Sequence, residues 1–278
     1  MREDMKFIDW FAGIGGFRKG MEMAGHECVG FCEFDKYAVM SYTSMHLITE
    51  EQREYLKTLP IKERQKEILK SEYRNGEWYA DDIRTVDARS IPKADCWCFG
   101  FPCNDISLAG RKEGLFGNRS SLFYRVMYLC GQLSEEDRPT YLFIENVRNL
   151  LGVNEGWDFA RVLIELDRGG YDAEWQVIDS KDFVPQHRER VFIVGHHRGR
   201  SGREVLPVER KNGKVPVQHK DKRQLGCKLC KHTGDEYLSM DDAYLIDIGT
   251  ECATALTRNY ANLGQHRATL IYEKKDET

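Results

Sequence analysis

The stretch MKFIDWFAGIGG, residues 5–16, joins a short apolar run to a turn that is rich in glycine. The apolar run is typical of a buried β-strand, and the residues that follow (GFRKGMEMAG, 16–25) have the spacing of a helix that ends at Gly25. A strand, a glycine turn and a helix in this order indicate the first unit of an α/β protein, with the turn at the carboxyl end of the strand.

The same alternation of strands and helices continues to residue 197. Further strands are predicted in HECVGFCEFD (26–35), near ADDIRTV (80–86), and in ADCWCFGF (94–101), PTYLFIENV (139–147), YDAEWQVIDS (171–180) and RVFIVGHH (190–197). Helices are predicted in SSLFYRVMYLCGQL (120–133) and WDFARVLIELDRGG (157–170). The charged residues 49–75, split by Pro60, indicate an exposed helical insertion. This order predicts an α/β fold with a doubly wound, mostly parallel sheet that presents ligands at the carboxyl ends of its strands.

Length and composition narrow the class of protein. A chain of 278 residues suggests one large domain, or one with a small appendage, and it can bury a substantial core without disulfides. Nine cysteines without a regular framework, in a chain whose charged start lacks the pattern of a signal peptide, predict a cytoplasmic protein. No apolar run approaches the ~18 residues of a membrane span, so we expect no membrane partner.

Charge is distributed unevenly along the chain. The net charge of −4 argues against a general nucleic-acid binder, but residues 198–231 hold eleven Lys or Arg against three Asp or Glu, a net of +8. Such a basic block is either a local anion-binding surface or a solvated loop. The alternation of strands and helices also stops at residue 197, so we place a boundary there between a domain of residues 1–197 and a smaller, irregular region of residues 198–278.

The glycine turn FAGIGG (11–16) is a candidate ligand site. Glycines let the backbone approach a ligand, and a helix that starts there offers N–H groups. On its own, such a turn fits a plain tight turn as well as an NAD, FAD or S-adenosylmethionine site. Glu33 ends the second strand, where a carboxylate can hold ribose hydroxyls, and Asp82 ends the third, where it can accept a hydrogen bond from an adenine amino group. These carboxylates favour a nucleoside cofactor.

The stretch GFPCNDIS (100–107) places a cysteine directly after the end of an apolar strand. Cys103 follows Pro102 at the end of the fourth predicted strand, where turn N–H groups favour the nucleophilic thiolate. Glu145 follows the apolar run of the next strand, where desolvation favours a protonated carboxyl group. A nucleophilic thiol, a proton-donating acid and a nucleoside cofactor together predict addition to a poorly electrophilic ring.

Six motifs carry a family resemblance: DWFAGIGGFR (9–18), CEFDKYA (32–38), DDI (81–83), GFPCNDIS (100–107), IENV (144–147) and PQHRERVFIVG (185–195). Together and in this order they resemble the cytosine-C5 DNA methyltransferase family of prokaryotes and phages. The resemblance covers residues 6–195. It implies the S-adenosylmethionine-dependent methyltransferase fold and an enzyme of DNA methylation and restriction-modification.

The resemblance implies a cofactor site for S-adenosylmethionine, the methyl donor. Phe11 would stack near the adenine, the backbone of the glycines would lie beside the methionine portion of the cofactor, and Glu33 would hold the ribose. The implied cofactor-binding residues are Phe11, Gly13, Gly15, Gly16, Glu33, Phe34, Asp82, Ile83 and Pro102.

The resemblance also implies a catalytic set and a substrate. Cys103 would attack C6 of a cytosine flipped out of double-stranded DNA, Glu145 would supply or hold the proton at N3, and Arg190 would contact O2. Arg188 and Gln186 would support that region. Two alternatives stay open: a tRNA cytosine-C5 methyltransferase with the same residues, and a non-catalytic subunit of a split methyltransferase that binds DNA or cofactor.

The sequence departs from the family pattern at three places. Asn104 stands where the family usually has glutamine after the Pro-Cys pair, Ser120 and Ser121 stand where the family often has Gly-Thr, and the third departure lies at the C-terminus. Residues 198–278 correspond to the region that recognises the DNA target, but the family's final Gly-Asn-bearing segment does not follow, which predicts a truncated product or a complementary C-terminal polypeptide as partner. Cys227 and Cys230 form half of a zinc site, for which His219 and Cys252 are conceivable ligands, or else are unliganded thiols; we predict no metal. We expect a cytoplasmic, nucleoid-associated enzyme in a prokaryotic host.

Overall fold

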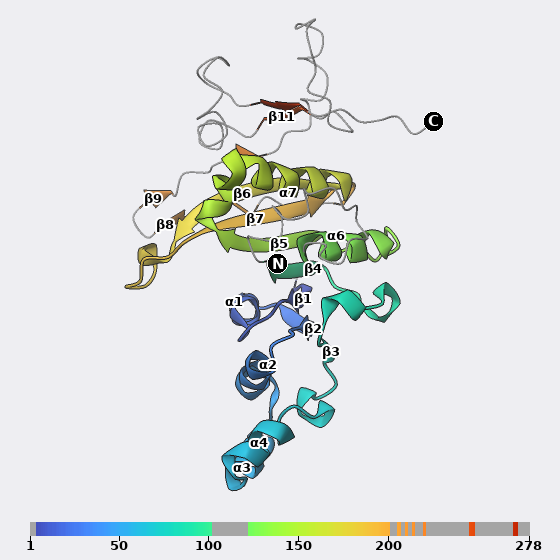
Figure 1. Ribbon diagram of the computed structural model, residues 1–278, viewed down its shortest axis with the longest axis vertical. Coiled ribbons are helices and arrows are strands. Elements are labelled where there is room, and N and C mark those ends of the chain that lie inside the picture. Colours follow the sequence, from blue (N-terminus) through green and yellow to red (C-terminus); the bar gives the residue numbers. More distant parts are fainter. Residues whose placement is uncertain are drawn as a thin grey trace, which may run out of the picture. The chain divides into compact units, whose positions relative to one another are not determined.

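The computed structural model describes residues 4–101 and 122–200, with shorter pieces at 205–206, 209–210, 213–214, 219–220, 245–247 and 269–271 (Figure 1). The chain forms two compact units. Unit 1 comprises Met1–Asp105 and Glu113–Ile144, and unit 2 comprises Ile106–Lys112 and Glu145–Thr278. Strand β5 (Tyr141–Val147) runs from the first unit into the second. The domain boundary placed at residue 197 stays a prediction.

Unit 1 contains the strands and helices expected around the glycine turn. Its elements are β1 (Lys6–Trp10), α1 (Gly16–Met23), β2 (Glu27–Cys32), α2 (Lys36–Tyr42), the π-helix η1 (Thr43–Leu47), α3 (Glu50–Thr58), α4 (Ile61–Glu67), η2 (Ser71–Arg74), β3 (Trp78–Ala80), η3 (Ile83–Thr85), η4 (Ala88–Ser90), β4 (Cys96–Gly100), α6 (Leu122–Gln132) and the first part of β5. Helices α3 and α4 lie within residues 49–75, where helices are predicted, and Pro60 stands at the N-cap of α4, as its missing N–H and fixed φ allow.

The strand order of unit 1 confirms the doubly wound arrangement. The strands lie in the order β5-β4-β1-β2-β3, and β1 pairs in parallel with β2 and β4, as β2 does with β3. The chain therefore proceeds outward from β1 to β3 and then resumes at β4 on the other side of β1. Ligands of such sheets bind beyond the carboxyl ends of the strands where the order reverses. In unit 1 this place lies beyond β1 and β4.

The centre of unit 1 is apolar on both faces of β1. Phe7, Ile8 and Trp10 are fully buried, as expected for a central parallel strand that is covered on both sides. The Trp10 ring makes edge contacts with Trp78 at 5.7 Å and Trp97 at 5.0 Å between ring centroids. This packing fixes the strand that leads into the glycine turn.

Unit 2 is built on an antiparallel pair. Its elements are the end of β5, η5 (Arg148–Leu151), η6 (Val153–Gly156), α7 (Trp157–Arg168), β6 (Tyr171–Asp179), η7 (Ser180–Asp182), β7 (Glu189–His197), β8 (Glu209–Arg210), β9 (Gly213–Lys214), β10 (His219–Lys220), β11 (Leu245–Asp247) and β12 (Thr269–Ile271). The strand order is β5-β7-β6-β10, and β6 and β7 are antiparallel from Tyr171↔His197 to Asp179↔Glu189. Helix α7 lies along β6 (Figure 1). The rings of Phe159 on α7 and Trp175 on β6 meet edge to face. In the described part of the chain, no helix has the length and apolar character that crossing a membrane requires.

Candidate functional site

The glycine turn between β1 and α1 has a left-handed backbone at three positions. The φ angles are 54° at Phe11, 56° at Gly13 and 87° at Gly15. Gly15 is the N-cap of α1, and no side chain caps the helix there. In the first turn of α1 the Arg18 amide donates to Asp9, while the amides of Gly16 and Phe17 give this end of the helix the partial positive charge that suits an anionic or carboxylate ligand group.

Glu33 is held against the turn, as its position at the end of β2 predicts. One carboxylate oxygen accepts a hydrogen bond from the Gly13 amide at 2.7 Å, and the other accepts one from the Asp35 amide at 2.7 Å. The Glu33 carbonyl also accepts a bond from the Tyr79 hydroxyl at 3.2 Å. The structure therefore brings together two of the predicted cofactor residues, Glu33 and Gly13, by a direct contact.

The ends of β2 and β3 are linked through Arg84. Its guanidinium makes a two-pronged ion pair with Asp82, with N···O distances between 2.7 and 3.0 Å, and lies 5.7 Å from the ring centroid of Phe34. Hydrogen bonds from Arg84 lower the pKa of Asp82, so its carboxylate is ionised at neutral pH. An adenine amino group would share Asp82 with Arg84. Ile83 is buried, and its carbonyl accepts a bond from Arg125 on α6.

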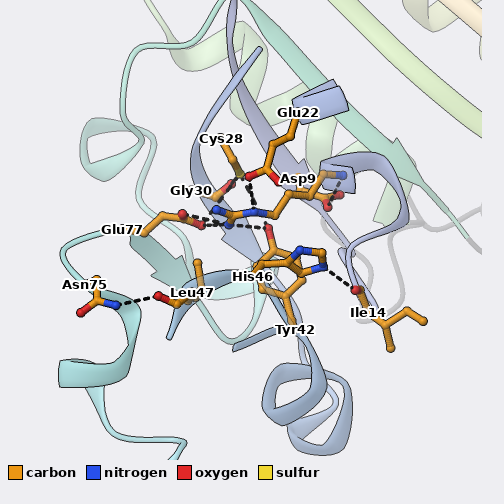
Figure 2. Close-up of polar contacts among 11 residues, drawn as sticks. Asp9, Ile14, Glu22, Cys28, Gly30, Tyr42, His46, Leu47, Asn75 and Glu77 are labelled. Carbon is orange, nitrogen blue, oxygen red and sulfur yellow. Dashed lines mark hydrogen bonds and ion pairs between the residues drawn. The ribbon is translucent and has the colours of Figure 1, made fainter. Parts of the chain in front are cut away.

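Arg18 is the centre of a mostly buried polar cluster next to the turn, and Figure 2 shows its partners Asp9, Tyr42 and Glu77. Arg18 Nη1 donates to the two oxygens of Glu77 at 2.6 and 2.9 Å and to the Tyr42 hydroxyl at 3.2 Å, while Nε donates to Glu22 at 2.8 Å. The Arg18 amide donates to Asp9, which is fully buried. Burial raises the pKa of Asp9 well above its usual range, although the bond from the Arg18 amide opposes this shift. The cluster ties the first turn of α1 to β1, α2 and the segment before β3.

We expect Arg18→Met to lower the free energy of unfolding by about 3 kcal/mol, because the mostly buried Glu77 would keep its carboxylate without its cation. Adding Glu77→Leu should recover part of this loss, and chemical denaturation measures both variants. The matched control is Lys57→Met, which breaks an ion pair with Glu54 whose two side chains are 58 and 61% exposed; it should have a much smaller effect, because solvent screens an exposed pair. If the effects of the Arg18 and Glu77 substitutions on the free energy of unfolding simply added, the two side chains would not be energetically coupled.

Sequence reasoning did not single out Asp9, Arg18 or His46, although all three contact the turn or the elements beside it. One signal was present: Asp9 is a charged residue inside an apolar strand, and charged residues are rarely fully buried without a partner. Arg18 gives no such signal, because a charged residue is ordinary in an amphipathic helix, and His46 lies in residues 36–48, for which the sequence predicts no element.

Three of the four predicted catalytic residues, Glu145, Arg188 and Arg190, lie together in unit 2. Arg190 Nε is 2.7 Å from Glu145 Oε1, and Arg188 Nη2 is 4.0 Å from the same oxygen. The exposed fractions of the side chains are 25% for Glu145, 20% for Arg190 and 55% for Arg188. Glu145 thus has a guanidinium as its neighbour, in contrast to the apolar surroundings expected from the preceding strand.

The arginines are positioned by a turn that Asp179 holds in shape. Asp179 accepts hydrogen bonds from the Lys181 amide, the Arg188 amide at 3.0 Å and His187 Nδ1 at 2.6 Å. Burial alone would raise the pKa of Asp179, but the hydrogen bonds from these groups and the Lys181 ammonium lower it. The Ser180 hydroxyl donates to the carbonyl of Gln186, which is itself exposed.

Several predicted residues lie outside the described part of the chain. These are Pro102, Cys103 and Asn104, and the possible zinc ligands Cys227, Cys230 and Cys252; of His219 only the backbone, in β10, is described. Within the ranges that are described, no group of three or more His, Cys, Asp and Glu side chains could hold a metal ion.

Comparison with known proteins gives a consistent match. The sequence model of the family described as "C-5 cytosine-specific DNA methylase" matches residues 5–58 and 55–270. The type II methyltransferase M2.ScrFI of Lactococcus lactis subsp. cremoris is 33% identical over 221 residues, covering 68% of this chain and 60% of the relative. The type II methyltransferase M.DsaV of Dactylococcopsis salina is 35% identical over 195 residues, covering 70% of this chain and 46% of the relative.

Among solved structures, the Dnmt2 methyltransferase of S. pombe has a TM-score of 0.46 and 16% identity, over 71% of this chain and 50% of that one. The chain spans between 46 and 60% of the length of the first curated relatives that it matches.

Proposed function

Because the chain belongs to the C-5 cytosine-specific DNA methylase family, we propose that it acts as an enzyme that transfers a methyl group from S-adenosylmethionine to C5 of a cytosine in double-stranded DNA. The match over residues 5–270 carries this proposal, since it contains the glycine turn, the Pro-Cys pair and the Glu145–Arg190 pair in one chain. Its type II relatives favour a role as the modification enzyme of a restriction-modification system.

The residues of the glycine turn fit a nucleoside cofactor of this kind. A Cβ atom added at Gly13 or Gly16 would meet no atom within 4 Å, so there is open space beside the turn. The start of α1 and the Glu33 carboxylate border the same turn and supply hydrogen-bond donors and acceptors. S-adenosylmethionine, when bound, supplies an electrophilic methyl group on a sulfonium.

We assign the binding of this cofactor to nine residues: Phe11, Gly13, Gly15, Gly16, Glu33, Phe34, Asp82, Ile83 and Pro102. The rings of Phe11 and Phe34 would contact the adenine, and Phe34 supports this role because its side chain is exposed beside the ends of β2 and β3. Glu33 would hold the ribose hydroxyls with lone pairs that the two backbone amides do not use.

The chemistry at the base is assigned to Cys103 and Glu145. C5 of cytosine is a weak nucleophile, so the ring must first be activated. The Cys103 thiolate forms a bond to C6 while Glu145 supplies a proton to N3, which leaves an enamine whose C5 is nucleophilic. C5 then takes the methyl group, which leaves S-adenosylhomocysteine. Loss of the C5 proton to a base expels the thiolate, and N3 returns its proton to Glu145 as the ring is restored. The base must leave the stacked duplex for this to occur.

We assign Arg190 and Arg188 to orienting the Glu145 side chain and the cytosine ring. The 2.7 Å contact between Arg190 Nε and Glu145 Oε1 supports this, because it fixes one oxygen of the acid. Arg190 retains further N–H groups in its guanidinium fork for the O2 atom of cytosine. Asp179 positions Arg188 through the hydrogen bond to its amide.

Residues 198–278 are proposed to recognise the DNA target. The net charge of +8 in residues 198–231 suits contacts with phosphates. We therefore expect duplex affinity to fall by a factor of at least about 10² between 50 and 200 mM salt, as measured by fluorescence anisotropy. Affinity that does not change with salt would indicate that residues 198–231 are a solvated loop that does not contact phosphates.

A complementary C-terminal polypeptide and association with the nucleoid stay predictions.

Transfer of tritium-labelled methyl groups tests the proposed function. The protein is incubated with labelled S-adenosylmethionine and either mixed-sequence duplex DNA or tRNA. Label in the duplex supports the proposal. Label in tRNA alone would identify the tRNA enzyme instead, and binding of cofactor or duplex without any transfer would identify a non-catalytic subunit.

A further inference from the structure

His46 reaches the glycine turn from a different element. It lies in the π-helix η1, and its Nε2 atom is 2.9 Å from the carbonyl oxygen of Ile14 (Figure 2). A carbonyl oxygen can only accept a hydrogen bond, so the Nε2 atom of His46 carries the proton and donates. The contact joins residues that are 32 positions apart in the sequence.

The direction of the His46 ring is set by the core of unit 1. The Tyr42 ring, which is fully buried, meets the His46 ring edge to face at 5.0 Å and stacks on Phe31 at 4.0 Å between centroids. Tyr42 also accepts the hydrogen bond from Arg18. The widened turn of η1 is closed by a bond from the Ile48 amide to the Thr43 carbonyl, and such single π-turns often occur at functional sites.

The His46 ring, the Tyr42 ring and the positive φ together exclude a side chain at Gly15. A Cβ atom at Gly15 would lie 2.3 Å from His46 Nε2, 2.8 Å from its Cδ2 and 3.0 Å from Tyr42 Cε2, and φ is +87°. Gly13 and Gly16 differ, because a Cβ there would meet nothing within 4 Å. The turn therefore has one glycine that faces protein and two that face open space.

Both polar groups of the peptide between Ile14 and Gly15 are held. His46 holds the carbonyl, and the Gly15 amide donates to the Ala12 carbonyl at 2.8 Å. A peptide held at both ends cannot rotate without breaking a hydrogen bond, so the orientation of the turn is fixed before any ligand arrives.

We propose that His46 is a positioning residue for the methyl-donor site: by donating to Ile14 it fixes the peptide that leads into Gly15 and the start of α1. This inference rests on the proposed function, because the turn is assigned to S-adenosylmethionine. Because His46 acts on the backbone of the binding turn, its loss should weaken the affinity for S-adenosylmethionine.

Three substitutions at His46 separate the hydrogen bond from the ring. A glutamine side chain can place an N–H near the position of Nε2, an asparagine is too short, and a phenylalanine keeps a ring without a donor. We expect His46→Phe and His46→Asn to raise the Kd and KM for S-adenosylmethionine about three- to tenfold, with a smaller change in kcat, and His46→Gln to stay within about twofold of wild type. Calorimetric titration and methylation kinetics measure these values.

A matched control is His26→Phe. His26 Nδ1 also bonds a backbone group, the Met5 amide at 3.2 Å, but at the start of β1 and away from the turn. Its Kd for S-adenosylmethionine should equal that of wild type. Equal Kd values for His46→Phe, His46→Asn and wild type would overturn the inference, whereas a wild-type protein that binds no donor would overturn the proposed function instead.

A double-variant cycle tests the same contact through stability. Gly15→Ala should lower Tm, and it should do so less in a His46→Ala background, because the ring that the new methyl group meets is gone. Equal losses of Tm in the two backgrounds would show that the ring does not crowd Gly15 and would also overturn the inference.

Discussion

Replacing Cys103 by serine is expected to abolish methyl transfer, lowering kcat by a factor on the order of 10⁴ or more, while duplex affinity stays close to that of wild type. A serine hydroxyl is not ionised at neutral pH, so it cannot add to C6 as a thiolate does. Single-turnover transfer of tritium-labelled methyl groups measures the rate, and anisotropy measures binding. If the Cys103→Ser protein transferred methyl groups at a rate near that of wild type, Cys103 would not be the nucleophile.

Cys28→Ser provides the matched control. Burial, reinforced by Glu77, raises the pKa of the Cys28 thiol to about 12, and burial likewise raises the pKa of Cys32 to about 12. These thiols remain protonated at neutral pH and are poor nucleophiles, so loss of Cys28 should leave kcat unchanged within about threefold. A duplex with 5-fluorocytosine at the target adds a second readout. It should trap a covalent adduct with wild type, because C5 then has no proton to lose, and none with Cys103→Ser.

Replacing Glu145 by glutamine is expected to lower kcat by a factor of about 10² to 10⁴. The amide oxygen can still accept the hydrogen bond from Arg190, so the variant should keep the local structure, but an amide cannot pass a proton to N3. Methylation kinetics at saturating S-adenosylmethionine and duplex measure the change.

The neighbouring ion pair between Arg148 and Glu189 gives the control for Glu145→Gln. It joins η5 to β7 at 2.9 Å, and its side chains are 60 and 33% exposed. Glu189→Gln removes a carboxylate beside Arg190 in sequence without touching Glu145, and an exposed pair contributes only about 0–1 kcal/mol. Its kcat should stay near wild type. Equal losses in the two variants would indicate that general charge at this edge, and not Glu145, supports the reaction.

The sheet and the glycine turn could be predicted because their signals are local. A run such as KFIDW contains Phe7, Ile8 and Trp10 within five residues, and Pro60 marks the break between two helices by its own chemistry. The contacts behind the turn could not be predicted in this way. Arg18 meets Glu77 across 59 positions and His46 meets Ile14 across 32, so each pair exists only after β1, β2 and β3 have assembled.

The surroundings of Glu145 show the same limit. The apolar residues before it predicted a desolvated carboxyl group, whereas the structure gives it Arg190 as partner. Arg190 reaches this place because β7 returns antiparallel to β6, in a register set by pairs such as Ile178↔Arg190. A single strand carries no information about the cation that a later strand will place beside it.

The proposed contact of Phe11 with adenine implies a compromise between thermal stability and activity at this position. Its φ of 54° lies in the left-handed region, where a bulky residue costs about 1–2 kcal/mol and a glycine costs almost nothing. An engineer who selected only for thermal tolerance would therefore tend to replace Phe11 by glycine and would lose the aromatic ring with it. Selection for heat resistance and selection for turnover should thus pull this one position toward different amino acids.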